Sequence, residues 1–168
     1  MKTCCLIGHR NVQPTARLSA TIKATLTDLI ENQDVRVFLF GSRSQFSSLC
    51  RGVVAELKKN YPEIRLIYVR SQYPTIPDYY TDYLLEFYDD TYMPKKLENA
   101  GMATYVERNQ AMINASDFCV FYYDENYQPP KRKYSKHCSS FYQPNSGTKL
   151  AYTYAKQKKK AIINVFTP

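Results

Sequence analysis

Short apolar runs alternate with longer amphipathic segments along this chain, and this alternation constrains the fold more than any other feature. The apolar runs have the length of buried strands and span residues 3–8, 35–40, 64–69, 117–123 and 161–166. Segments with apolar residues near helical spacing cover 15–32, 46–60, 78–88, 104–115 and 148–158. Such alternation is typical of a parallel sheet covered on both faces. The sequence therefore predicts an α/β three-layer sandwich with a mostly parallel sheet of about five strands.

Length and composition favour one globular domain over residues 1–168. The chain has 168 residues, of which 44% are hydrophobic and 14% aromatic, enough to build a real core. No run approaches the roughly 20 apolar residues of a membrane span, and the first residues lack a signal-peptide pattern. We therefore expect a cytoplasmic protein that does not enter a membrane.

An aromatic-rich excursion at 71–103 interrupts the alternation. Seven aromatic residues are interleaved with acidic ones there, namely Tyr73, Tyr79, Tyr80, Tyr83, Phe87, Tyr88 and Tyr92. The segment is too aromatic for a disordered linker, so we expect a packed excursion with one short helix near 78–88. It could be a lid over a ligand, or it could cover the sheet edge or a subunit interface.

A polar loop at 124–145 separates the fourth predicted strand from the last helix, and we expect it to be mobile without ligand. It carries Lys131, Arg132, Lys133 and Lys136, part of a net charge of +8. Solvated charge explains such a cluster, although Tyr134, Phe141 and Tyr142 beside it could stack bases of a single-stranded nucleic acid.

The cysteines and histidines do not indicate a metal centre. The five cysteines are Cys4, Cys5, Cys50, Cys119 and Cys138, an odd number without a C-x-x-C pair. Three of them fall inside apolar runs, so we expect reduced thiols. With only His9 and His137 besides, neither a metal nor another cofactor is implied.

Three segments share the composition of an anion site. Ser146, Gly147 and Thr148 open a helical run, where unpaired backbone N–H groups and the helix dipole can hold a phosphate. Two strands end in a glycine followed by an arginine, at Gly8-His9-Arg10 and at Gly41-Ser42-Arg43. In a parallel sheet these strand ends lie along the same edge as the helix start, where such folds bind ligands.

Each feature also has a purely structural explanation. Ser146 makes an ordinary helix N-cap, and Gly8 and Gly41 can serve only a tight strand-to-helix turn. Arg10 and Arg43 can be solvated loop residues, and Arg108 can be a surface partner of Glu107. His9 suits a hydrogen-bonding turn residue better than a catalyst.

These segments resemble the SLOG superfamily, and most of all its small single-domain YpsA-like group, also called DUF1273. The resemblance covers nearly the whole chain and rests on four motifs: the turn at 8–10, the turn at 40–46 followed by Leu49-Cys50, the helix Glu107-Arg108-Asn109 with Met112 and Ser116-Asp117, and the start at 146–148. It implies a Rossmann-like fold that binds nucleotides or nucleotide-derived ligands. More distant relatives are the LOG phosphoribohydrolases, the single-strand-binding DprA proteins and SLOG sensors of cyclic ADP-ribose-type signals.

One departure from the LOG pattern bears on catalysis. Glu107-Arg108 matches the LOG Glu-Arg-Lys motif with Asn109 in place of lysine. The second LOG motif ends in a catalytic glutamate, whereas the corresponding stretch of this chain, residues 144–152, contains no glutamate. Glycoside cleavage needs a carboxylate to stabilise charge or position water. The resemblance therefore favours binding over hydrolysis.

The first hypothesis is a sensor or sequestering protein for a nucleotide or an ADP-ribose-type signal. Its ligand would contact Gly8, His9, Arg10, Gly41, Ser42, Arg43, Phe46, Arg108, Asn109, Tyr123, Ser146, Gly147 and Thr148, with arginines on phosphate oxygens and Tyr123 or Phe46 on a base. The alternatives are an N-glycoside hydrolase that uses Glu107 and Arg108, with Asp124 or Glu125 as a substitute carboxylate, and single-stranded nucleic-acid binding. By family analogy we expect a homo-oligomer, a dimer or larger.

Overall fold

The computed structural model describes residues 1–71, 75–95, 97 and 102–168. Its helices are α1 (Ala16–Gln33), α2 (Gln45–Leu57), α3 (Asp78–Leu85), α4 (Met102–Asn114) and α5 (Gly147–Gln157). Its strands are β1 (Lys2–Gly8), β2 (Val35–Phe40), β3 (Arg65–Val69), β4 (Asp90–Tyr92), β5 (Phe118–Tyr122), β6 (Arg132–Lys133), β7 (Phe141–Tyr142) and β8 (Ala161–Asn164). All five predicted helices are present, including the short helix in the excursion.

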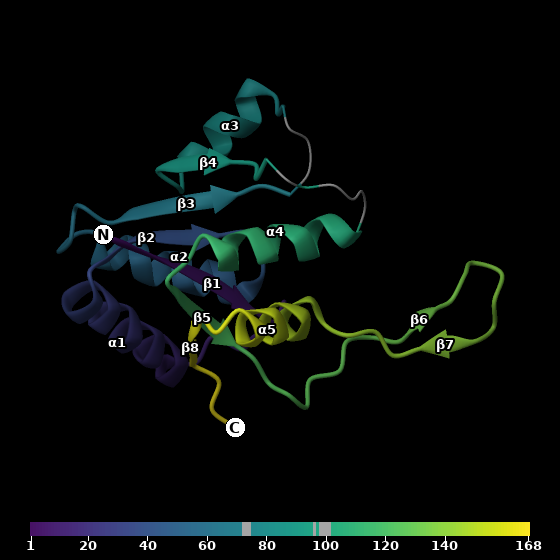
Figure 1. Cartoon of the computed structure of the whole chain (residues 1–168). Coiled ribbons are helices and arrows are strands. Elements are labelled where there is room, and N and C mark those ends of the chain that lie inside the picture. The colour runs from purple at the N-terminus through teal and green to yellow at the C-terminus, as the bar shows by residue number, and fades with distance from the viewer. Residues whose placement is uncertain (72–74, 96, 98–101) are drawn as a thin grey trace.

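Six strands form one sheet in the order β4-β3-β2-β1-β5-β8, and every neighbouring pair is parallel. The chain moves outward from β1 through β2 and β3 to β4, then returns to place β5 and β8 on the other side of β1 (Figure 1). This is the doubly wound arrangement, and it confirms the predicted Rossmann-like α/β class. The sheet has one strand more than expected, because β4 forms inside the 71–103 excursion.

The residues of β1 alternate between the two faces of the sheet, which explains why the run is apolar throughout. Cys4 and Leu6 pack with α1 and α2, whereas Cys5 and Ile7 pack with α4 and α5. A strand buried on both faces must be apolar at every position. The three layers are therefore α1 and α2, the sheet, and α4 and α5 (Figure 1).

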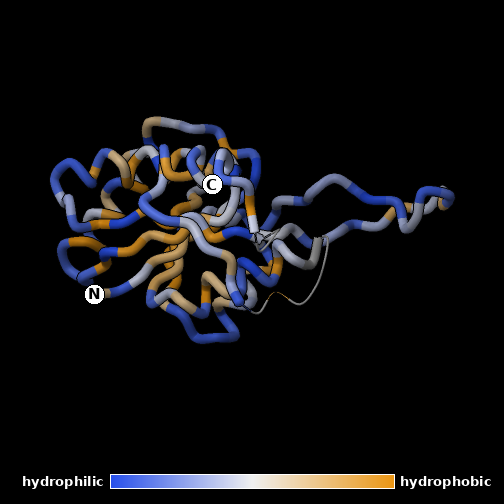
Figure 2. The backbone as a smooth tube through the Cα atoms, turned by 90° about the horizontal axis from the view of Figure 1, so that it is seen from above, coloured by the Kyte–Doolittle hydropathy of each residue, from blue (hydrophilic) through white to orange (hydrophobic). Residues whose placement is uncertain are grey.

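The segment between β5 and α5 contains an antiparallel hairpin of β6 and β7 that lies outside the main sheet. Figure 2 shows it as a long arm that extends away from the body of the molecule. The sequence predicted this segment as a loop, and the two short strands are an addition to that prediction. Part of the 71–103 excursion, including Tyr73, falls outside the described residues.

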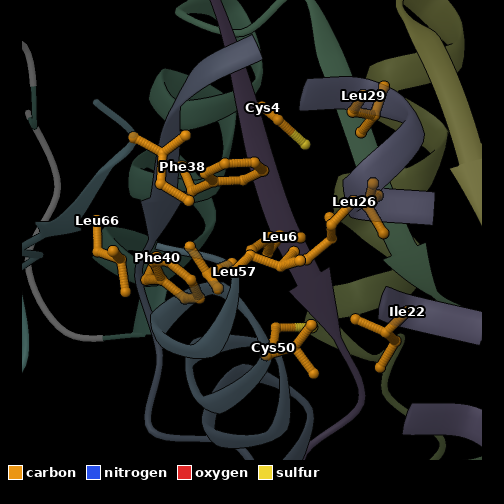
Figure 3. Close-up of a cluster of buried hydrophobic side chains, with 14 of the residues drawn as sticks. Cys4, Leu6, Ile22, Leu26, Leu29, Phe38, Phe40, Cys50, Leu57 and Leu66 are labelled. Atoms are coloured by element: carbon orange, nitrogen blue, oxygen red, sulfur yellow. The ribbon is translucent and has the colours of Figure 1, made fainter. Parts of the chain in front are cut away.

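The larger part of the core lies between the sheet and the pair α1 and α2. Figure 3 shows Leu6 of β1 among Leu26 of α1, Phe40 of β2 and Leu57 of α2, all nearly or fully buried. All five cysteines are free thiols, and all except Cys138 are buried. Burial raises the pKa of the Cys50 thiol well above its usual value, because the apolar surroundings disfavour a thiolate.

Local signals fix where the helices begin. The hydroxyl groups of Thr15, Ser44 and Ser146 each accept a hydrogen bond from a backbone N–H in the first turn of α1, α2 and α5. Helix α1 ends at Asp34, whose φ of 57° is left-handed. Among the described residues, no helix combines the length and the apolar character needed to cross a membrane.

Candidate functional site

The candidate site lies at the edge of the sheet where the parallel strands end. Strands β2 to β4 are added on one side of β1, and β5 and β8 on the other side. The ends of β1 and β5 therefore flank the topological switch point. In Figure 1 the first turns of α4 and α5 lie toward this same edge. Doubly wound folds bind ligands at such a switch point because loops and helix starts meet there.

The first turn of α5 offers free backbone donors. The Ser146 hydroxyl caps the helix by accepting the Lys149 N–H at 3.0 Å. Among the described residues, no acceptor lies on the N–H of Gly147 or Thr148. Gly147 is exposed, and a Cβ added to it would meet nothing within 4 Å, so the space beside its Cα is open. A helix start with unpaired N–H groups is a favourable place for an anion.

The first turn of α2 differs, because two of its first three N–H groups are already used. The Gln45 N–H donates to the Arg10 carbonyl at 2.9 Å, and the Ser47 N–H donates to the Ser44 hydroxyl at 3.1 Å. The hydroxyl groups of Ser42, Ser44 and Ser47 also bond to one another at 2.8 to 3.1 Å. Ser42 therefore supports the turn after β2, and α5 is the better anion acceptor of the two helices.

Arg108 is the most deeply buried charged residue of the predicted site, with 4% of its surface exposed. Its side chain lies over the end of β2, since a Cβ on Gly41 would come within 2.6 Å of its Nε and of the Met112 sulfur. Gly41 is thus required for the close approach of Arg108 to the strand backbone. The sequence had offered a surface salt bridge with Glu107 as the alternative, and the burial of Arg108 excludes a surface position.

The hydrogen bonds of Arg108 are few for a buried guanidinium. Its Nε donates to Asn109 Oδ1 at 3.0 Å, and one terminal nitrogen lies 3.5 Å from the Val69 carbonyl. No ion pair joins it to a carboxylate anywhere in the described ranges. Desolvation lowers the pKa of Arg108 to about 10, so the group stays charged at neutral pH, and the described part of the chain offers it the Tyr105 ring at 5.9 Å but no carboxylate.

His9 joins the two strand ends at the switch point. It follows β1 directly, and its Nε2 accepts the Asp124 N–H at 3.0 Å beyond the end of β5. Nε2 also lies 3.3 Å from the Asp124 carbonyl, to which the ring donates in the tautomer with its proton on Nε2; in the tautomer that accepts the Asp124 N–H, the proton lies on Nδ1. Nδ1 is buried and has no hydrogen-bond partner among the described residues. His9 therefore holds an unpaired ring nitrogen beside the candidate site.

The surroundings of His9 keep it neutral. Only 3% of its surface is exposed, and the Tyr127 ring lies 4.2 Å from its own. Burial lowers the pKa of His9 below its ordinary value of 6.5, and the Asp124 carbonyl near Nε2 and the charge of Asp124 only partly oppose this shift. Protonation of His9 would also remove the acceptor that holds the Asp124 N–H.

The structure places Arg10 and Arg43 at the same edge of the sheet but turns them in different directions. Arg10 is exposed, and no side-chain interaction is found for it within the described part of the chain. Arg43 donates to the Tyr80 hydroxyl at 2.8 Å and lies over the rings of Tyr80 and Tyr83, so it faces α3. Arg43 therefore links the turn after β2 to the aromatic excursion.

Phe46 and Gly8 form a packing pair. Phe46 has no exposed surface, and a Cβ on Gly8 would come within 2.4 Å of its ring. A base cannot stack on a ring without exposed surface, so in this conformation Phe46 is a core residue. Tyr123 is half-buried and stacks on Tyr152 at 4.5 Å, which leaves it as the aromatic candidate at the end of β5.

The three carboxylates considered for catalysis occupy different positions. Glu107 is half-buried on α4 beside Arg108 and has an interaction of its own. Asp124 accepts the Asn126 N–H at 2.9 Å, and Glu125 is exposed. Counted from Gly147-Thr148, the position of the LOG glutamate is taken by the buried Ala151, and the ring of the next residue, Tyr152, contacts Tyr123 and Phe121.

Three supporting residues were not expected from the sequence. They are Ser47, which completes the serine cluster of α2, Tyr80, which binds Arg43, and Tyr127, which packs on His9. The contact of Ser47 could have been predicted from the sequence, since a serine three residues after the Ser44 cap lies on the same side of the turn. The contacts of Tyr80 and Tyr127 could not, because they join residues 37 and 118 positions apart in the chain.

Two hollows of the described surface lie away from these residues. One is a shallow depression along α1 between Ala20 and Asn32. The other, of about 260 Å³, lies at the start of α1 between Thr15, Tyr122 and Thr167. Neither is lined by Arg108 or Thr148, so the candidate site consists of an open edge with one buried arginine.

The fold and this edge define a Rossmann-like α/β protein with an anion-accepting helix start. The family model YpsA, described as the YspA SLOG family, matches residues 7–155. The chain therefore belongs to the YpsA SLOG family, as the motifs predicted. No curated protein sequence matches it.

Among solved structures, the chain is similar to DNA processing protein A from Helicobacter pylori. The TM-score is 0.53 at 15% sequence identity, over 96% of this chain and 63% of that one. That protein's structure was described for its single-stranded DNA binding mode. This chain thus spans less than two thirds of the neighbour's length, and the likeness establishes a shared fold.

Proposed function

We propose that this chain binds a nucleotide or nucleotide-derived small molecule and acts as a sensor or sequestering protein. The observation that carries the proposal is Arg108, a guanidinium buried to 4% exposure without a carboxylate among the described residues. An uncompensated buried charge is costly to a fold. A ligand phosphate would supply the missing charge, and its planar oxygens suit the arginine fork.

In this proposal the phosphate lies on the first turn of α5. The free N–H groups of Gly147 and Thr148 donate to it, and the positive end of the helix dipole favours its charge. Arg108 and the exposed Arg10 pair with other oxygens of the ligand. Tyr123 presents the ring for a base, and the Nδ1–H of His9 serves a ligand acceptor at the switch point.

Family membership supports this class of ligand. The SLOG enzymes and sensors named above act on nucleotides or signals derived from them, and the Helicobacter pylori neighbour binds a nucleic acid. Nucleotides and nucleic acids share one chemical pattern, a phosphate attached to a sugar and a base. An ADP-ribose-type ligand combines these elements in one small molecule and is our preferred candidate.

Hydrolysis of an N-glycosidic bond is the second candidate function. It is favoured by one observation, the adjacency of Glu107 and Arg108 on α4, which matches the LOG motif. It lacks the second carboxylate, because the buried Ala151 stands where the LOG motif has its glutamate. Loss of such a catalytic group costs roughly two to four orders of magnitude in rate.

Titration of purified protein with nucleoside monophosphates, NAD, ADP-ribose and cyclic ADP-ribose, followed by chromatography of the ligand, tests the proposal. We expect saturable binding with intact ligand recovered. Arg108→Met should weaken binding, whereas the matched control Arg17→Met, at an exposed arginine, should leave it unchanged. Release of free base would favour the hydrolase, and no binding of any compound would overturn the proposal.

A further inference from the structure

The β6–β7 hairpin forms a small sheet of its own, separate from the main sheet. Its strands are two residues each and pair only with one another. Figures 1 and 2 show it projecting from the body, away from the sheet and its helices. Isolated two-stranded hairpins are marginally stable in water. A hairpin of this size is expected to become well ordered only when another surface covers it.

The hairpin arm, residues 128–144, is both basic and aromatic. It carries Lys131, Arg132, Lys133 and Lys136, and no Asp or Glu occurs anywhere after Glu125. Tyr134 is 69% exposed and its ring lies 5.0 Å from that of Tyr142, while Lys133 lies over Phe141. Both faces of the arm therefore present cations next to rings.

A surface of opposite charge lies on α3 and the turn that follows it. Its inner row, Tyr80, Leu84 and Tyr88, packs on the core. Two outer rows with the same spacing of four residues face solvent: the acidic row is Asp78, Asp82 and Glu86, and the aromatic row is Tyr79, Tyr83 and Phe87. Side chains four apart lie on one side of a helix, so each row is continuous.

The outer surface of α3 is exposed and contacts two arginines at its margin. Tyr79 is 76% exposed, and no ion pair involves the three acidic residues within the described part of the chain. Arg43 lies over the Tyr83 ring at 5.5 Å, and Arg51 lies over the Phe87 ring at 4.4 Å. A face of this kind suits further cations and rings.

We propose that the hairpin arm of one copy docks on the outer face of α3 of a second copy. Arg132 and Lys133 then face the acidic row, while the arm's exposed rings pack on the aromatic row. Within one molecule α3 and the arm lie on different sides of the body (Figure 1), so the contact forms between copies. A two-fold pair makes the contact twice and covers both surfaces.

Charge reversal tests this contact by sedimentation velocity over a range of protein concentrations. Reversing the arm with R132E/K133E, or α3 with D78K/D82K, places like charges opposite one another. Each variant should weaken self-association on the order of tenfold or more. The control R17E/K59E makes the same change in net charge at two exposed residues elsewhere and should associate as the wild type does.

Mixing the two reversed proteins gives the sharpest readout. The arm of each then faces an α3 of opposite charge, so an equimolar mixture should recover association that neither variant shows alone. Far-UV circular dichroism of each variant confirms that it is folded. A wild type that stays monomeric, reversed variants that associate normally, or a mixture without recovery would each overturn the proposal.

The arm also resembles a surface for single-stranded nucleic acid, and one further measurement separates the two. The wild type is titrated with an oligothymidine strand at rising salt concentration. Tight, strongly salt-dependent binding that R132E/K133E abolishes, in a protein that remains monomeric, would assign the arm to nucleic acid and contradict our proposal.

Discussion

At the scale of single residues, Arg108 concentrates the argument for function. Its guanidinium is buried beneath the edge of the sheet, and the partners found for it among the described residues are an amide oxygen, a carbonyl at 3.5 Å and the Tyr105 ring, with no carboxylate. Gly41 is kept small so that Arg108 can lie there. A residue that costs stability and shapes its neighbour is expected to serve a ligand.

Replacing Arg108 should therefore separate stability from binding. Arg108→Met keeps the volume and removes the uncompensated charge, so the free energy of unfolding should stay within about 1 kcal/mol or rise. Nucleotide affinity should fall roughly 10- to 100-fold, because charged hydrogen bonds are lost. Urea denaturation and calorimetric titration measure the two effects. A large loss of stability with unchanged affinity would make Arg108 a structural residue.

His9 should make stability depend on pH just below neutrality. Its pKa in the folded protein is lowered, so the unfolded chain takes up this proton first. Stability should be full above about pH 6.5 and fall as the pH drops toward the lowered value. The carboxyls with lowered pKa values, such as Asp34 and Glu56, lose their contribution only at lower pH.

The measurement is the urea midpoint between pH 5 and 8 for the wild type and for His9→Gln. The substitution should flatten the decline, although it should lower overall stability. The exposed His137 provides the control, since His137→Gln should leave the decline in place. Equal slopes in the wild type and His9→Gln would refute the role assigned to His9.

Gly8 should be essential for packing. A Cβ at this position would come within 2.4 Å of the Phe46 ring, so Gly8→Ala should cost roughly 1–3 kcal/mol in unfolding free energy. Gly8→Ala with Phe46→Leu should recover part of the loss, because the smaller side chain makes room. Gly52→Ala is the control, since its added Cβ would meet nothing within 4 Å. If the double variant recovers no stability, the loss in Gly8→Ala comes from the backbone conformation and not from a clash with the Phe46 ring.

These glycines show what sequence could and could not reveal about the site. The Gly-His-Arg and Gly-Ser-Arg turns predicted which strand ends share one edge of the sheet, because a glycine after an apolar run is a local signal. They did not reveal that Gly8 accommodates Phe46 or that Gly41 accommodates Arg108, since both are contacts between distant segments. For the same reason Phe46 could be mistaken for a base-stacking residue.

At the scale of elements, α5 differs from α2 although both begin with a serine cap. Helix α2 donates its first N–H groups to Arg10 and Ser44, whereas Gly147 and Thr148 of α5 keep theirs free. The sequence predicted both helix starts but could not show in which helix the first N–H groups find acceptors on neighbouring residues. This contrast is what assigns the proposed phosphate to α5.

A substitution at Gly147 should block the site without harming the helix. Gly147→Asp places a carboxylate in the first turn, where it suits the dipole, so thermal stability should be unchanged or slightly higher. The same carboxylate should repel a phosphate and abolish nucleotide binding in equilibrium titrations. Gly147→Ala has open space and should bind as the wild type does. Full binding by Gly147→Asp would exclude this turn.

The helices and the five main strands could be predicted because each repeats its pattern over several residues. The additional elements could not. Strand β4 is three residues long and forms because Asp89, Asp90 and Thr91 bond to β3 and its neighbourhood, a contact invisible in sequence. The β6–β7 hairpin is shorter still and has only one cross-strand pair on each face.

At the scale of the whole molecule, the sheet brings the ends of β1, β2, β3 and β5 to one edge. One surface there carries the proposed ligand site, and two others, the hairpin arm and α3, are proposed to join copies. The family model of the YpsA SLOG family covers residues 7–155, which contain the residues of these surfaces. The two proposals are independent, since the arm and α3 contain none of the residues placed on the phosphate.

The most direct test of the central claim is a crystal structure of the protein with adenosine monophosphate. The account predicts phosphate oxygens within hydrogen-bond distance of the N–H groups of Gly147 and Thr148, with the Arg108 guanidinium in contact with the ligand. A phosphate bound elsewhere, or a bound nucleotide that Arg108 does not touch, would contradict it.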